Sequence, residues 1–123
     1  GPLGAARPAI RRGIPAVAAS AGFEELADYA AGATLIADWI TEHRAELAGG
    51  TADTATVTSF NVPGCKAGEP KAVIEVPLAA VIPDGIDAFS TADCGIVPAS
   101  PPTDDVAGML GGYLTVTQVP AEL

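Results

Sequence analysis

Residues that commonly carry out catalysis or bind metals are scarce in this sequence. Its 123 residues include one histidine, one tryptophan and two cysteines. Structural zinc sites need four cysteine or histidine ligands, usually in closely spaced pairs, whereas Cys65 and Cys94 are far apart. His43 has no sequence partner that suggests catalysis, and it follows Trp39 by one helical turn. We therefore expect no metal site and no catalytic residues in this chain, and we interpret His43 as a partly solvated neighbour of Trp39.

Basic residues and long apolar runs are also scarce. Six lysines and arginines stand against fifteen aspartates and glutamates, which gives a net charge of −9. Such a surface repels the phosphates of nucleic acids and of anionic lipids. No apolar run approaches the roughly 18 residues that a membrane-spanning helix needs. The sequence therefore predicts neither a nucleic-acid nor a membrane partner.

The chain begins without an initiator methionine and without the pattern of a signal peptide. Residues 1–4 (GPLG) are typical of what remains when a protease removes a purification tag, and the next residues are typical of a domain interior. Hydrophobic residues make up 49% of the sequence, which is enough to form a core. We expect residues 5–123 to form a single domain.

The two cysteines allow two interpretations. They form a disulfide in an oxidising compartment, or they are two unrelated buried thiols. Both lie in loop-like surroundings rich in Pro, Gly and Asp, "VPGCKAGEP" and "TADCGIVPAS". This context favours a disulfide between Cys65 and Cys94, which would close a loop of roughly 30 residues.

Two helices are predicted in the first half of the chain. Residues 5–12 are helix-like up to Gly13, although Pro8 is unfavourable unless it falls in the first turn. Apolar residues recur every three or four positions over 23–48, with acidic residues tending to the other side. This pattern predicts one long amphipathic helix that covers a sheet and ends at the glycine pair 49–50.

Four segments are predicted as strands. They are residues 14–20, typical of a strand buried on both faces, 55–62, 71–78 and 113–119. Pro77 indicates that the third is an edge strand or contains a bulge. Residues 79–102 are rich in Pro and Gly and predict an irregular excursion. Residues 103–105 (TDD) then resemble the N-cap of a short helix that ends at the glycines 111–112.

Three stretches in the same order resemble one family. "GAARPAIRRGIPAVAAS", "FNVPGC" and "TDDVAGMLGGYLTVTQV" are similar to segments of SurE-type 5′(3′)-nucleotidases, over nearly the whole chain. The cysteines are similar to those of secreted bacterial members. Two features depart from the family: Ser59 stands where an extra Asn is common, and a Ser-Gly-Thr turn is replaced by residues 1–3. The resemblance implies a secreted or extracytoplasmic protein.

The resemblance also implies a fold, a site and a cofactor. The chain would be the C-terminal half of an α/β, Rossmann-like SurE fold, with a parallel sheet strand, a long covering helix and a C-terminal β-hairpin or extension. The helix N-terminus at Gly4 and Ala5 would face the phosphate. The parent enzyme would be a metal-dependent phosphomonoesterase acting on nucleoside monophosphates or other phosphate esters, with Mg²⁺ or Mn²⁺ held by upstream residues. Asp104 and Asp105 belong to the closing signature and not to that metal site.

Two hypotheses follow from these expectations. In the first, the chain is part of such a nucleotidase and is inactive alone, because the metal-binding residues are absent. In the second, it is a non-catalytic Rossmann-like module for binding or oligomerisation. Both predict self-association, most simply a dimer, because a half-sheet leaves a strand edge and apolar surface uncovered.

Overall fold

The computed structural model describes residues 2–21, 28–86 and 90–122. Its helices and strands follow one another along the chain as α1 (Pro2–Arg11), β1 (Val17–Ser20), α2 (Tyr29–Glu42), α3 (Arg44–Gly49), β2 (Thr56–Asn61), β3 (Cys65–Ala67), β4 (Lys71–Glu75), β5 (Ala92–Asp93), α4 (Asp105–Leu110) and β6 (Tyr113–Pro120). No helix in these ranges combines the length and the apolar character needed to cross a membrane.

The main sheet has four strands in the order β1-β2-β6-β4. The outer pairs, β1 with β2 and β4 with β6, are parallel, and the central pair, β2 with β6, is antiparallel. This arrangement confirms the predicted α/β class. The expected C-terminal hairpin is not among these pairings, because β6 lies between β2 and β4 instead of folding back on the strand that precedes it. The strand predicted over 71–78 is an edge strand with a register shift between Lys71 and Val73, as Pro77 indicated.

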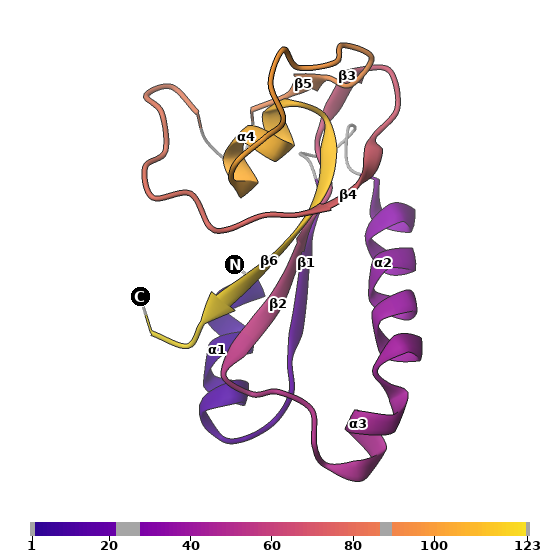
Figure 1. The fold of residues 1–123 in the computed structure, drawn as a ribbon, viewed down its shortest axis with the longest axis vertical. Helices are drawn as coiled ribbons and strands as arrows, with labels where there is room; N and C mark the ends of the chain where they lie inside the picture. Colours follow the sequence, from indigo (N-terminus) through magenta and orange to yellow (C-terminus); the bar gives the residue numbers. More distant parts are fainter. Residues whose placement is uncertain (1, 22–27, 87–89, 123) are drawn as a thin grey trace.

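Helices cover both faces of the sheet (Figure 1). On one face, Ala6 and Ile10 of α1 pack with Ala18 and Val57 of β1 and β2 into the hydrophobic core. Helix α4 lies on the same face, where it packs against β6. Helix α2 contacts β1 and β2 on the opposite face. Because α2 reaches only these two strands, the β6 and β4 side of that face has no helix over it among the described residues.

The long helix predicted over 23–48 is interrupted. Residues 22–27 lie outside the described residues, and α2 begins after Asp28, whose carboxylate accepts a hydrogen bond from the Ala31 amide. The backbone leaves the helical conformation at His43, where both the N–H and Nδ1 bond the Trp39 carbonyl, and α3 then continues to Gly49. Gly50 ends it in the left-handed conformation, with φ of 73°, as the glycine pair predicted.

Helix α1 begins earlier than predicted. It starts at Pro2 rather than Ala5, and Leu3 packs against the core cluster. The residues interpreted as a protease remnant therefore contribute to the helix. Pro8 lies inside the helix and not in its first turn, so the Gly4 carbonyl receives no intrahelical amide from Pro8.

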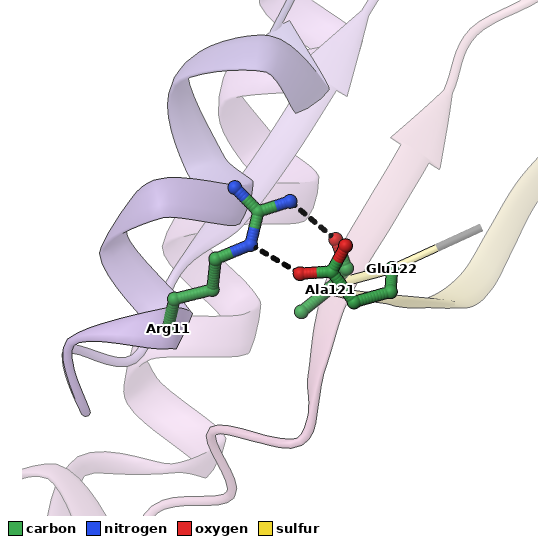
Figure 2. A network of polar contacts seen from close by, with 3 residues as sticks. All are labelled: Arg11, Ala121 and Glu122. Carbon is green, nitrogen blue, oxygen red and sulfur yellow. Dashed lines mark hydrogen bonds and ion pairs between the residues drawn. The ribbon is translucent and has the colours of Figure 1, made fainter.

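The end of α1 is tied to the end of the chain by Arg11 (Figure 2). Its Nε donates to the Glu122 carboxylate over 2.7 Å and its Nη2 donates to the Ala121 carbonyl over 2.9 Å. The Arg11 and Glu122 side chains are largely exposed, so the ion pair itself adds little stability. The contact does fix where the chain runs after β6.

A disulfide joins Cys65 and Cys94, as the loop context favoured. The bond ties β3 to β5, two short parallel strands that the sequence pattern did not predict. The Lys71 ammonium donates to the carbonyls of Cys94 and Gly111, over 2.6 and 2.8 Å. The excursion over 79–102 is thereby attached to the end of α4.

Candidate functional site

A cavity of about 270 Å³ lies beside the first turn of α1. The cavity is lined by residues of α1, β1, β2, β6 and α4 and of the segment after β4. They are Leu3, Gly4, Ser20, Ser59, Asn61, Leu78, Asp105, Thr117 and Val119. Helix α1 precedes β1 and runs back along it, so its N-terminus lies near the carboxyl ends of β1 and β2. Ligands of open α/β sheets bind at this end of the strands.

Strand register explains why polar side chains gather in this cavity. Ser59 of β2 is opposite Thr117 of β6, and Asn61 is paired with Ser20 of β1. Side chains alternate between the two faces of a strand, so residues two apart in β2 share a face. The cavity thus receives three hydroxyl groups and one amide from three adjacent strands. The next pair on the same face of β2 and β6 is Val57 opposite Val119. Both side chains are buried in the hydrophobic core.

The first turn of α1 offers backbone donors to the cavity. The first amides of a helix have no intrahelical acceptor, and Pro2 has no N–H, so Leu3 and Gly4 carry the free ones. Gly4 lines the cavity, whereas Ala5 is exposed and is not among the lining residues. The partial positive charge of the helix end favours an anion at this position.

Thr117 is the most informative side chain of the cavity. It is 1% exposed, and its hydroxyl has no hydrogen-bond partner among the described residues. A buried hydroxyl without a partner costs about 1–3 kcal/mol, so such groups are normally satisfied by protein, water or a ligand. Thr115 has the same property at 0% exposure but does not line the cavity. The Thr117 hydroxyl is therefore an unsatisfied buried group at the cavity, and a molecule bound there is one source of a partner.

The two aspartates of the closing segment have structural partners. Asp104 is the N-cap of α4, and its carboxylate accepts from the Ala107 amide over 2.7 Å. Asp105 lines the cavity, but its Oδ1 accepts from the Ala79 and Val106 amides, over 2.7 and 3.0 Å. This confirms the interpretation of the pair as a helix cap. It also shows that Asp105 anchors the segment after β4.

The remaining sequence candidates lie elsewhere. The His43 ring is partly buried and stacks on Trp39 with a centroid distance of 4.4 Å, the partly solvated contact that the spacing suggested. Within residues 2–21, 28–86 and 90–122, no three His, Cys, Asp or Glu side chains are grouped so that they could hold a metal ion.

Sequence reasoning pointed to the α1 end of the cavity but missed most of its floor. Gly4 was singled out, and Asn61 was part of the quoted "FNVPGC". Ser20, Ser59 and Thr117 were not assigned to a site. Thr117 reaches the cavity through its pairing with Ser59, 58 positions earlier, and no local pattern encodes that pairing. The alternation of β6 gives a weak signal, since threonines 115 and 117 occupy inward positions where apolar residues are usual.

Comparison with protein-family models and with curated proteins finds no match to this chain.

Proposed function

We propose that this chain forms the phosphate-binding side of a phosphomonoesterase of the SurE nucleotidase type. The observation that carries the proposal is the cavity at the N-terminus of α1, with the buried, unpartnered Thr117 hydroxyl in its floor. The substrate would be a nucleoside monophosphate or another phosphate ester whose terminal phosphate enters this cavity.

The chemistry of the lining suits a phosphoryl group. A phosphate needs several hydrogen-bond donors, and here the Leu3 and Gly4 amides combine with the hydroxyls of Ser59 and Thr117. Asn61 adds a side-chain amide that also donates. All are neutral, so the helix end supplies the electrostatic attraction. The resemblance to the nucleotidase family supports the proposal, because the motifs quoted for it contribute Gly4, Ser20 and Asn61.

The described residues do not provide a complete binding site for a divalent cation. Mg²⁺ and Mn²⁺ prefer oxygen ligands that include carboxylates. Asp105 is the one carboxylate that lines the cavity, and it already accepts two backbone amides through the same oxygen. A metal-dependent reaction at this position would need carboxylates from outside the described residues. We therefore assign this chain binding and orientation of the phosphate, and no step of hydrolysis.

Phosphate titration of the 123-residue chain tests the proposal. Amide chemical shifts in NMR spectra should change at Leu3, Gly4 and Thr117 as inorganic phosphate is added. Substituting Thr117→Val removes the hydroxyl and keeps the shape of the side chain, and it should weaken phosphate binding about tenfold, the loss of one hydrogen bond to a charged group.

The matched control is Thr115→Val, which removes a similarly buried hydroxyl that does not line the cavity. Phosphate affinity should be unchanged in this variant. Equal affinity of both variants and the parent chain, or shift changes confined to residues remote from α1, would contradict the proposal.

A non-catalytic assembly role is the second candidate, and exposed apolar side chains favour it. Val81 and Ile82, in the segment after β4, are 78% and 60% exposed. Strand β1 pairs on one side only among the described residues, which leaves a free sheet edge. Such features mark surfaces that another chain covers. This role is compatible with the phosphate site, since the cavity lies on the α1 face of the sheet.

A further inference from the structure

A second, larger cavity lies on the opposite face of the sheet. Its volume is about 540 Å³, within the range of roughly 300–1,000 Å³ usual for sites that bind small molecules. Its lining residues come mainly from the second half of α2, from the segment before β2, and from β2, β6 and β4. It shares no lining residue with the cavity beside α1. We call it the α2 groove.

Strand register sets the floor of the α2 groove, which has an apolar part beside the polar side chains of Thr56, Thr58 and Gln118. Phe60 of β2 is paired with Val116 of β6, and Val116 is paired with Glu75 of β4. These three side chains form one row across the sheet, and each lines the groove. Val73, two residues before Glu75, extends the apolar surface and is 44% exposed. Phe60 itself is only 5% exposed, so Val73 and the half-buried Val116 provide the apolar surface that a ligand can contact.

The wall of the groove is aromatic. Trp39 lines it from α2, and the His43 ring stacks on Trp39 at an interplanar angle of 18°. Stacking holds the indole in one orientation, so an aromatic surface is already in place before a ligand binds. Tryptophan is also the side chain that attracts cations most strongly through its ring face.

The charges around the groove have one sign. Four carboxylates line it, those of Asp38, Glu42, Asp53 and Glu75, and the only basic side chain among the lining residues is His43. Among the described residues, none of the four is in an ion pair. Low-dielectric walls beside charges of one sign concentrate ligands of the opposite sign. The apolar floor, the aromatic wall and the acidic rim together define the chemistry of the occupant.

We propose that the α2 groove binds a small organic cation with an apolar body, a hydrophobic amine or guanidinium compound. The apolar body would lie on Val73 and Val116, beside the buried Phe60, and its charged group would face Trp39 and the carboxylates. Charge complementarity selects this class over an anionic ligand, and also over a second copy of this chain, whose net charge is −9. The proposal is independent of the phosphate site.

Fluorescence of Trp39 provides a direct test, because it is the only tryptophan of the chain. The 123-residue protein is titrated with phenylbutylamine and with its neutral and anionic analogues, phenylbutanol and phenylbutyrate. We expect saturable changes in Trp39 emission with the amine, at least tenfold weaker binding of the carboxylate, and intermediate binding of the alcohol. The same amine should bind equally well in the presence of phosphate.

Variants separate charge from folding. The double substitution Asp38→Asn and Glu75→Gln should weaken amine binding about tenfold and leave binding of the alcohol unchanged. Glu69→Gln removes an exposed carboxylate outside the groove and should have no effect. A circular-dichroism spectrum identical to that of the parent chain shows that each variant is folded.

Three results would overturn the proposal. They are non-saturable response to the amine, equal affinity for amine and carboxylate, and retention of amine affinity in the folded double variant. Amine affinity that falls as the protein concentration rises would identify a second copy of the chain as the occupant of the groove, and it would be a fourth result that overturns the proposal.

Discussion

Gly112, between α4 and β6, shows how tightly one residue can be constrained. Its φ is +80°, and a side chain there would place Cβ 2.8 Å from the Cα and 3.0 Å from the Sγ of Cys94. Its carbonyl accepts from the Lys71 amide over 2.7 Å. The disulfide, the end of α4 and the start of β4 therefore meet at a position that only glycine can occupy without strain.

We predict that Gly112→Ala destabilises the protein by about 2–4 kcal/mol in urea unfolding, because the new methyl group meets the Cys94 backbone as well as an unfavourable φ. Gly50→Ala is the matched control. It has a φ of +73° with nothing within 4 Å of the added Cβ, so it should cost only about 1 kcal/mol. Equal costs for the two substitutions would refute the close contact with Cys94.

Among the residues that line the cavity beside α1, the sequence indicated some and did not indicate others. Gly4 was named through the resemblance to the nucleotidase family, which implies a helix start facing the phosphate at this position. Thr117 was missed because its role depends on pairing with Ser59. A threonine in an alternating strand is ordinary for β structure, and only the assembled sheet shows that its hydroxyl is buried without a partner.

Among the elements, α4 depends most on its cap. It has six residues, too few to be stable on its own, and its N-cap is Asp104. The helix packs closely on β6, since a Cβ at Gly108 would lie 2.5 Å from Cγ2 of Thr115. A loosened α4 would also release Asp105, which accepts a hydrogen bond from the Ala79 amide.

We predict that Asp104→Ala lowers the free energy of unfolding by about 1 kcal/mol, because the Ala107 amide loses its acceptor. Asp104→Asn should be nearly neutral, since asparagine caps a helix as well as aspartate does. Thermal denaturation of the three proteins measures the effect. An asparagine variant as unstable as the alanine variant would show that charge, and not capping, is what Asp104 contributes.

Most helices and strands were predicted within a few residues of their bounds, whereas the shortest strands and one helix break were missed. The helix at 5–12 and the strands at 55–62 and 113–119 appear within a few residues of their predicted bounds. The break of the long helix at His43 was missed, because the apolar spacing continues across it into α3. Strands β3 and β5 have three and two residues in Pro- and Gly-rich segments, too short for any periodicity to show.

For the whole molecule, the free edge of β1 and the exposed Val81 and Ile82 bear on assembly. We predict a concentration-dependent dimer in sedimentation velocity, and we expect Val81→Ser with Ile82→Ser to shift the equilibrium toward monomer. The control substitution is Val97→Ser, because Val97 is an apolar residue that is 74% exposed elsewhere on the surface. A monodisperse monomer at high concentration would contradict the assembly role.

The two cavities give the molecule two chemically different faces. The cavity beside α1 presents hydroxyls, one side-chain amide and a helix end, which suit an anion, and the carboxylate of Asp105 beside them is held by two backbone amides. The face beside α2 presents carboxylates and aromatic rings, which suit a cation. The four-stranded sheet separates them, so each can be changed by substitution without touching the residues of the other.

The most direct test of phosphate binding in the cavity beside α1 is to locate bound tungstate in crystals of this chain. Tungstate is a phosphate analogue that scatters X-rays strongly. We expect an anomalous peak within hydrogen-bonding distance of the Gly4 amide and the Thr117 hydroxyl, lost in Thr117→Val and retained in Thr115→Val. Tungstate found only beside surface arginines and lysines, with the cavity containing none, would contradict it.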